Sequence, residues 1–338
     1  MPTLRLAILG AGIFVRDTYL PNIEATRGRC KLTAMLSRSA ESVDEALALL
    51  SDGGDDVARF VGSEGEARFF ASARDLCDAV IIVVPIPLLG GYVEKCLSLG
   101  LHILSEKPVA VTSDEATRLI NLYRQPGRPS GSGLWHVAEN YRLEPSVLYA
   151  RDVVASKSPL RPKTFALTCI RQQSPTSKYA VTAWRAQPSY RGSYVLDGGI
   201  HFIALLREVL GVDSISDIRA HYEESSAVEV GTCGSCRAGD AVGPVHIRYG
   251  AFVAPVCRLD VFFEDATLSI IQHKAEGYEV LMTGREPRRF AFEGLQREWD
   301  LWLDTMDGAG AGVEAGALSP EQGLTDLKIV EALVGPAA

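Results

Sequence analysis

The sequence lacks a long hydrophobic run, an excess of positive charge and a regular array of cysteines. Its longest apolar stretch with almost no charge, Ala79–Leu89, is too short to cross a bilayer and contains two prolines. The 34 basic and 42 acidic residues give a net charge of −8, which disfavours general binding to phosphate backbones. Seven scattered cysteines, an odd number, do not resemble a disulfide framework. We therefore expect neither a nucleic-acid partner nor a membrane.

The chain does have the length and composition of a globular protein. Its 338 residues suffice for two domains with sizeable cores. They are 47% hydrophobic and 22% charged, which argues against extensive disorder. The first residues lead directly into a strand-like run without a signal-peptide core. These features predict a soluble protein of the cytoplasm.

Strand-like and helix-like segments alternate over the first 124 residues. Apolar runs typical of buried parallel strands occur at 4–9, 31–36, 80–84 and 101–104. A helix is expected after each, and one begins at the capping-box sequence Thr112-Ser113-Asp114-Glu115. The alternation predicts an α/β domain over residues 1–124, with a doubly wound parallel sheet.

A second domain is expected to follow a connector. Residues 125–133 are rich in glycine, proline and serine, and a helix is predicted over 145–156. Strand-like runs follow at 164–170, 215–223, 245–253, 257–264, 267–273 and 278–283. From 215 onward they are closely spaced, which predicts an α+β domain over 125–317 with a large, mostly antiparallel open sheet. Residues 318–338 are expected to form a final helix that packs back on the first domain.

The first predicted strand ends in a glycine turn, Gly10-Ala11-Gly12, which Ile13 and Phe14 follow. In a dinucleotide fingerprint the first glycine permits the tight turn, and the second lets the backbone approach a pyrophosphate. Val15 stands where the fingerprint has a third small residue. Because the turn directly follows a strand and opens a βαβ unit, it predicts dinucleotide binding more than a purely structural turn.

The end of the second predicted strand bears on the choice of cofactor. An acidic residue there would accept hydrogen bonds from the adenosine ribose and repel a 2′-phosphate. The chain has Ser37-Arg38-Ser39 instead, and hydroxyl and guanidinium groups donate to phosphate. NADP(H) is therefore the preferred cofactor, with NAD(H) as the alternative. A solvated loop arginine is the other reading of Arg38.

Two further motifs place reactive side chains at element ends. Glu106-Lys107-Pro108 follows a predicted buried strand, and Lys107 there is either a functional ammonium or the ion-pair partner of Glu106. Asp197 and His201 are four residues apart in a glycine-containing stretch, so on one helical turn they would share a face. A carboxylate beside an imidazole suits general acid–base chemistry, although a structural histidine is the alternative.

Together these motifs resemble the Gfo/Idh/MocA family, which includes glucose–fructose oxidoreductase and inositol dehydrogenase. The resemblance covers nearly the whole chain and rests on the glycine turn, Glu106-Lys107-Pro108 and Asp197-x-x-x-His201. Trp184-Arg185 and Pro320–Leu324 also match. The resemblance implies a Rossmann domain and a substrate domain. It also implies a homodimer or homotetramer formed through the outer face of the C-terminal sheet.

The resemblance implies an NADP(H)-dependent oxidoreductase acting on CH–OH groups. Hydride would pass between the nicotinamide and a hydroxyl or carbonyl carbon of a sugar, polyol, diol or related small molecule. His201 would be the general acid/base, Asp197 would orient it, and Lys107 would stabilise the alkoxide. The expected cofactor contacts are Gly10, Gly12, Ile13, Phe14, Ser37, Arg38, Pro85, Glu106 and Lys107. The expected substrate contacts are Tyr141, Arg142, Trp184 and Arg185.

Departures from the family pattern keep a second reading open. Val15 is bulky, Val84–Leu89 lacks the family's usual asparagine and histidine, and the glycine-rich stretch before Asp197 is reduced. The alternative is a non-enzymatic NAD(P)-binding regulatory or scaffold protein on the same fold. Cys233-Gly234-Ser235-Cys236 supplies only two of the four ligands of a structural zinc site. We interpret it as a turn in a solvent-facing loop, and no metal is expected.

Overall fold

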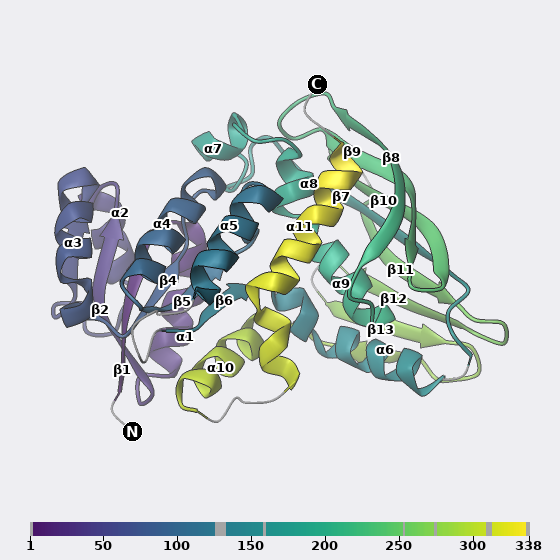
Figure 1. Ribbon diagram of the computed structural model, residues 1–338, viewed down its shortest axis with the longest axis horizontal. Helices are drawn as coiled ribbons and strands as arrows, with labels where there is room; N and C mark the ends of the chain where they lie inside the picture. The colour runs from purple at the N-terminus through teal and green to yellow at the C-terminus, as the bar shows by residue number, and fades with distance from the viewer. Residues whose placement is uncertain are drawn as a thin grey trace. The chain divides into compact units, whose positions relative to one another are not determined.

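The computed structural model describes residues 3–125, 133–157, 160–252, 254–273, 276–308 and 313–335 (Figure 1). The chain divides into two compact units, residues 1–138 with 298–324 and residues 139–297 with 325–338. Most of the predicted connector 125–133 lies outside the described residues, which resume at Gly133. Among the described helices, none has both the length and the apolar character needed to cross a bilayer.

A six-stranded parallel sheet forms the centre of the first unit. Its strands are β1 (Leu4–Leu9), β2 (Cys30–Ser37), β3 (Ala58–Val61), β4 (Ala79–Ile82), β5 (His102–Glu106) and β6 (Trp135–Ala138). They lie in the order β3-β2-β1-β4-β5-β6, and every neighbouring pair is parallel. The order reverses between β1 and β4, and beyond the carboxyl ends of such strands open α/β sheets bind their ligands. The predicted Rossmann-type sheet is confirmed.

Helices connect the strands of the first unit. They are the π-helical η1 (Val15–Tyr19), which runs into α1 (Leu20–Ala25), and α2 (Ala40–Leu47), α3 (Gly62–Leu76), α4 (Ile86–Ser98) and α5 (Ser113–Arg124). The predicted cap of α5 is confirmed, because Oγ1 of Thr112 accepts a hydrogen bond from the backbone N–H of Glu115 at 3.2 Å. The sequence did not predict β3, α3 or β6.

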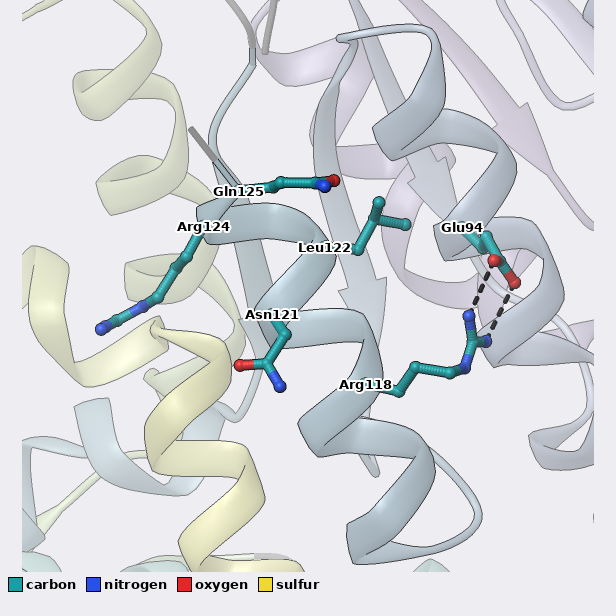
Figure 2. Close-up of a pocket in the computed structure, with 6 residues that line it drawn as sticks. All are labelled: Glu94, Arg118, Asn121, Leu122, Arg124 and Gln125. Atoms are coloured by element: carbon teal, nitrogen blue, oxygen red, sulfur yellow. Dashed lines mark hydrogen bonds and ion pairs between the residues drawn. The ribbon is translucent and has the colours of Figure 1, made fainter. Parts of the chain in front are cut away.

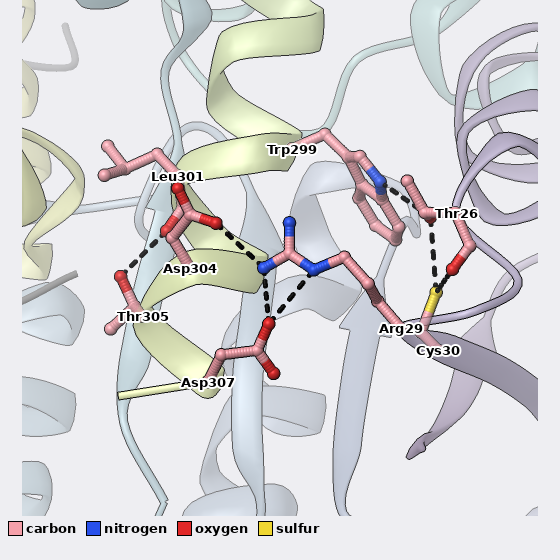
Figure 3. Close-up of polar contacts among 8 residues, drawn as sticks. All are labelled: Thr26, Arg29, Cys30, Trp299, Leu301, Asp304, Thr305 and Asp307. Carbon is pink, nitrogen blue, oxygen red and sulfur yellow. Dashed lines mark hydrogen bonds and ion pairs between the residues drawn. The ribbon is translucent and has the colours of Figure 1, made fainter. Parts of the chain in front are cut away.

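A helix from far along the chain, α10 (Gly294–Met306), completes the core of the first unit. Figure 3 shows its polar contacts with Thr26 and Arg29. Its inward side chains, each at most 1% exposed, are Trp299, Trp302 and Leu303. Trp299 Nε1 donates to Thr26 Oγ1 at 3.2 Å. The Arg29 guanidinium pairs with Asp304 at 2.8 Å and with Asp307 at 2.6 Å. Two buried indoles therefore secure α10, and an ion-pair cluster lies at its C-terminal end.

The second unit contains an eight-stranded sheet, in the order β14-β13-β12-β11-β7-β10-β9-β8. Its strands are β7 (Thr164–Gln172), β8 (Ile215–Glu224), β9 (Val230–Ala238), β10 (Ala241–Gly250), β11 (Val256–Phe262), β12 (Thr267–His273), β13 (Gly277–Met282) and β14 (Arg288–Phe290). Neighbours are antiparallel except β7 and β10. The predicted large, mostly antiparallel sheet is confirmed.

The remaining helical segments are η2 (Asn140–Leu143), α6 (Pro145–Ser156), α7 (Ala183–Ala186), α8 (Ser193–Asp197), α9 (Ile200–Leu210), η3 (Val313–Leu318) and α11 (Pro320–Val334). Asp197 ends α8 and His201 lies in α9, so the two residues belong to consecutive helices and not to one. Gly198 and Gly199 separate the two helices. A Cβ on Gly198 would lie 2.4 Å from Tyr249 Oη, and one on Gly199 would lie 2.5 Å from the Val195 carbonyl oxygen. Glycine is therefore required at Gly199, where the clash is with backbone, whereas a side chain at Gly198 would require Tyr249 to move.

Strand β9 corrects the interpretation of the cysteine pair. Cys233 and Cys236 lie within this strand, not in a solvent-facing loop. Cys233 is exposed, whereas Cys236 is 2% exposed. Residues three apart on a strand project to opposite faces of the sheet. The two thiols therefore cannot converge on one metal ion from this strand.

Candidate functional site

The glycine turn after β1 has the geometry that dinucleotide binding requires. Gly10 has φ of +118°, and a Cβ on it would lie 2.1 Å from the carbonyl oxygen of Val83, just after β4. Glycine is thus needed where β1 and β4 diverge at the switch point of the sheet. Gly12 is exposed, and a Cβ there would meet nothing within 4 Å. The turn therefore offers open backbone at the edge of the sheet where this fold binds phosphates.

Val15, the departure from the fingerprint, is accommodated in the protein core. Its side chain is fully buried in a hydrophobic cluster that also contains Ala11 and Tyr19. It begins the π-helical segment η1, a type of irregularity that is common at functional sites. The bulk of Val15 is therefore taken up by the core, and the exposed Gly12 keeps its open surroundings.

The predicted phosphate-reading residues lie at the carboxyl end of β2. Ser37 is the last residue of this strand, and Arg38 is exposed directly after it. Ser39 is the N-cap of α2, where its Oγ accepts a hydrogen bond from the backbone N–H of Ser42 at 3.3 Å. Arg38 and Ser37 are therefore the groups at this position that fit a phosphate.

Glu106 and Lys107 lie at the carboxyl end of β5. Tyr19 Oη donates a hydrogen bond to Glu106 Oε1 at 2.7 Å. Burial raises the pKa of Tyr19 well above its usual value, and the charge of Glu106 adds to this effect. Lys107 is partly buried and precedes a cis peptide bond to Pro108.

The other predicted cofactor contacts lie in the same unit. Pro85 is the N-cap of α4, in the connection that leaves β4, and Ile13 and Phe14 are partly buried just before η1. Because β1, β2, β4 and β5 are parallel, their carboxyl ends share one edge of the sheet, and the predicted cofactor residues lie along that edge.

In the second unit, His201 is held by a carboxylate and an aromatic ring. Its Nδ1 lies 2.7 Å from Oε1 of Glu139, which is 4% exposed. The Tyr141 ring stacks on the imidazole with ring centres 4.6 Å apart and planes 15° apart. Sequence reasoning missed Glu139, whose only signal is an acidic residue directly after the buried strand β6.

Asp197 forms a largely buried ion pair with an arginine. It is 6% exposed and accepts a hydrogen bond from Arg185 Nε at 2.7 Å. The Arg185 guanidinium in turn lies 3.9 Å from the ring centre of Trp184. The structure thus brings together Asp197, Arg185 and Trp184 as one group. The carboxylate found against His201 is that of Glu139.

Arg142 is buried, whereas a residue that contacts a substrate is usually accessible to solvent. Its side chain is 2% exposed, and its guanidinium pairs with Asp326 on α11. Arg207 pairs with the same carboxylate at 2.6 Å. Both pairs hold the Arg142 guanidinium in the interior of the unit, which disfavours a direct contact with a substrate.

A polar row on the eight-stranded sheet continues from Tyr141. Burial raises the pKa of Tyr141 to about 12. Gln272 Nε2 donates to Tyr141 Oη at 3.3 Å and to Tyr278 Oη at 3.1 Å. Arg171 donates to Gln272 Oε1. The sequence did not indicate these groups, because they come from three separate strands, β7, β12 and β13.

Two surface hollows of the first unit lie away from these residues. One, of about 560 Å³, is lined by Glu94, Arg118, Asn121, Leu122, Arg124 and Gln125, and Figure 2 shows Arg118 making two hydrogen bonds to Glu94. The other, of about 530 Å³, lies between α3 and α4. Neither is lined by a predicted site residue, so neither indicates the site.

Comparison with known proteins agrees with this fold. Residues 4–133 match a family described as an oxidoreductase family with an NAD-binding Rossmann fold. A protein of Fusarium mangiferae named dehydrogenase FPY6 is 29% identical, over 98% of this chain and 96% of its own. A Haloarcula marismortui protein named D-xylose 1-dehydrogenase [NADP(+)] is 27% identical over 45% of this chain and 39% of its own. The crystal structure of an oxidoreductase from Thermotoga maritima has a TM-score of 0.83 and 24% identity, covering 98% of this chain and 96% of its own.

Proposed function

Because the chain belongs to the Gfo/Idh/MocA family of NAD(P)-dependent oxidoreductases, we propose that it transfers hydride between NADP(H) and a CH–OH carbon of a sugar or polyol. The observation that carries this proposal is the oriented imidazole of His201, held by Glu139 and Tyr141. A regulatory or scaffold protein has no need of a histidine so constrained. Lys107 would stabilise the negative charge on the reacting oxygen, and the open glycine turn would bind the cofactor's pyrophosphate.

The proposed reaction divides the work between cofactor and protein. The nicotinamide, when bound, accepts or returns the hydride. In alcohol oxidation His201 takes the hydroxyl proton, and the Lys107 ammonium stabilises the negative charge that develops on the oxygen. The products are a carbonyl compound, the reduced cofactor and a proton that passes from His201 to solvent. In the opposite direction His201 returns that proton to the carbonyl oxygen.

The preference for NADP(H) rests on the end of β2. Arg38 is exposed and Ser37 partly buried at the position from which this fold reads the adenosine ribose. A guanidinium and a hydroxyl donate to a 2′-phosphate, and no carboxylate stands at the end of β2 to repel it. The Haloarcula marismortui relative, whose name includes NADP(+), supports the same preference.

The substrate that we propose is a neutral, polyhydroxylated small molecule. Tyr141, Trp184 and Arg185 are its proposed contacts, since rings and fixed polar groups suit a sugar surface. The proposal includes a cytoplasmic location and a homodimer or homotetramer formed through the outer face of the eight-stranded sheet.

A fluorescence titration with NADPH and, separately, NADH tests the cofactor assignment. Tighter binding of NADPH is the expected result, and replacing Arg38 with aspartate should reverse the order. Turnover is then assayed with NADP⁺ and a panel of aldoses and polyols, D-xylose included. His201→Ala should lose turnover while binding NADPH as the unaltered protein does, and Lys107→Ala should also lose turnover. Unchanged turnover in either variant contradicts the assigned roles, and failure to bind either cofactor contradicts the proposed function.

A further inference from the structure

Glu139 combines burial with a direct contact to His201. Its Oε1 lies 2.7 Å from Nδ1 of His201, and the two side chains are 6% and 17% exposed. The two residues are 62 positions apart in sequence, so the contact is tertiary. A buried carboxylate must be stabilised by hydrogen bonds or opposite charge, and this one contacts the residue assigned the proton transfer.

The position of Glu139 is fixed by its own backbone surroundings. It directly follows β6 and is the N-cap of η2, where Oε1 also accepts a hydrogen bond from the N–H of Tyr141 at 3.3 Å. Arg142 is in the same 3₁₀ turn. Burial lowers the pKa of Arg142, and the charges of Asp326 and Glu139 more than offset this. The carboxylate is thus held at the end of a strand, beside a buried positive charge.

The contact dictates which ring nitrogen of His201 carries a hydrogen. An ionised carboxylate only accepts hydrogen bonds, so Nδ1 must donate. In the neutral imidazole the lone pair is then on Nε2. When Nε2 takes a proton, the positive charge that forms on the ring lies next to the Glu139 carboxylate. Glu139 therefore favours the tautomer whose Nε2 accepts a proton.

Tyr141 fixes the plane in which this contact acts. Its ring lies parallel to the imidazole, and Gln272 Nε2 holds its hydroxyl at 3.3 Å. Phe202, next to His201 in α9, packs edge-on to Tyr141 with ring centres 5.7 Å apart. Tilting the imidazole out of this plane would break the stacking, and a half-turn within the plane would break the bond to Glu139. One orientation of Nε2 is therefore strongly favoured.

We propose that Glu139 is the positioning residue for His201, selecting its Nδ1–H tautomer and directing Nε2 to exchange the proton of the substrate oxygen. The proposal rests on the proposed function for the identity of the proton transfer. The tautomer itself is independent of any activity. The role of orienting His201, which was expected of Asp197, is thus assigned to Glu139, which directly follows β6.

The first test reads the tautomer directly. The full-length protein is labelled with ¹⁵N-histidine, and the ring-nitrogen shifts of its six histidines are recorded by NMR, with His201→Gln identifying the His201 signals. We expect a protonated Nδ1 and an unprotonated Nε2 in the neutral form. Glu139→Ala should convert His201 to mixed tautomers. Glu139→Asp should restore part of the Nδ1–H signal. The matched control Glu223→Gln, at a half-exposed carboxylate on β8, should leave the spectrum unchanged.

The second test measures turnover with NADP⁺ and D-xylose as the probe. Glu139→Gln should lower kcat on the order of 10- to 100-fold, as is usual when an orienting partner is lost, with KM little changed. Glu223→Gln should turn over normally. A His201 tautomer that is unaffected in Glu139→Ala, with circular dichroism showing the fold intact, overturns the proposal, and so does an unchanged kcat in Glu139→Gln. If the tautomer changes but no sugar is turned over, the positioning role stands and the proposed function is what has failed.

Discussion

The guanidinium of Arg142 and the carboxylate of Asp326, 184 residues apart in sequence, form an ion pair in which each side chain is 2% exposed. Arg207 on α9 binds the other oxygen of the same carboxylate at 2.6 Å. Burial raises the pKa of Asp326, although both guanidinium groups oppose the shift. The triad joins α11, α9 and η2, and η2 directly follows Glu139.

Removing the charge of Asp326 should therefore destabilise the protein strongly. Asp326→Asn removes the carboxylate that two buried guanidinium groups share, although Glu208 still lies 3.5 Å from Arg142. Breaking a buried ion pair typically costs about 3–5 kcal/mol. The free energy of unfolding from urea titrations measures this loss. Asp240→Asn is the matched control, because Asp240 is 74% exposed and 3.9 Å from Arg161, so its change should be within about 1 kcal/mol. A loss in Asp326→Asn no larger than in the control would contradict the structural role of the triad.

Glu144 should make stability fall as the pH rises. Its side chain is 2% exposed, and burial raises its pKa to about 7, although backbone N–H groups of Glu293 and Gly294 oppose this. The raised pKa means that the folded state holds the proton more tightly than the unfolded state does. The associated stability is present below pH 4.5 and is lost as the pH rises through about 7.

Glu144→Gln should flatten that dependence, because an amide does not titrate. The difference in unfolding free energy between the variant and the original chain should change by up to about 3 kcal/mol across this pH range, in favour of the variant at the upper end. Chemical denaturation at a series of pH values gives the curve. Glu264→Gln, at an exposed carboxylate paired with Lys163, is the control. Its curve of unfolding free energy against pH should be parallel to that of the original chain. A parallel curve for Glu144→Gln would refute the assignment.

The sequence predicted the elements whose patterns are local. Mostly apolar runs and the glycine turn identified β1, β2, β4 and β5, and the run 145–156 identified α6. Strand β9 was missed because Gly231, Gly234 and two cysteines give it a turn-like composition. Helix α10 was missed because its stability comes from packing Trp299 and Trp302 into a core formed by residues near the other end of the chain. No local pattern reports such a partner.

The same distinction applies to the candidate site. The residues proposed to hold the cofactor lie at or just beyond the carboxyl ends of parallel strands, which share an edge, so their common location could be predicted. The pairing of Asp197 with His201 rested on helical spacing, which Gly198 and Gly199 interrupt. Glu139 reaches His201 across 62 residues, and only the folded chain shows that contact.

Cys233 should be the cysteine that reacts with iodoacetamide in the folded protein. It is exposed on β9, whereas the other six cysteines are buried. Burial also raises the pKa of Cys236 to about 11 and that of Cys77 to about 12, so little thiolate is present at neutral pH. Mass spectrometry after brief alkylation should find one modified site, which Cys233→Ser abolishes and Cys236→Ser preserves. Rapid labelling at Cys236 or Cys77 would contradict the burial that the structure gives them.

His136 should make the protein sensitive to acid. It lies on β6, is 6% exposed, and among the described residues its Nδ1 has no hydrogen-bond partner. Burial lowers its pKa to about 4, and the neighbouring charge of His102 contributes. In the unfolded chain His136 therefore binds a proton near pH 6.5, whereas in the folded chain it does so only near pH 4. Stability is present above the upper value and is lost as the pH falls toward the lower one.

His136→Gln should remove this loss, whatever the substitution costs at neutral pH. As the pH falls between the two values, the free energy of unfolding should decrease by up to about 3 kcal/mol less in the variant than in the original chain. The reason is that glutamine has no proton to bind. His221→Gln on β8 is the control, since His221 is exposed and its replacement should leave the slope unaltered. The measurement is the slope of unfolding free energy against pH over this range. An unaltered slope in His136→Gln would mean that His136 is already charged in the folded protein, and that the interior around β6 is more polar than its contacts indicate.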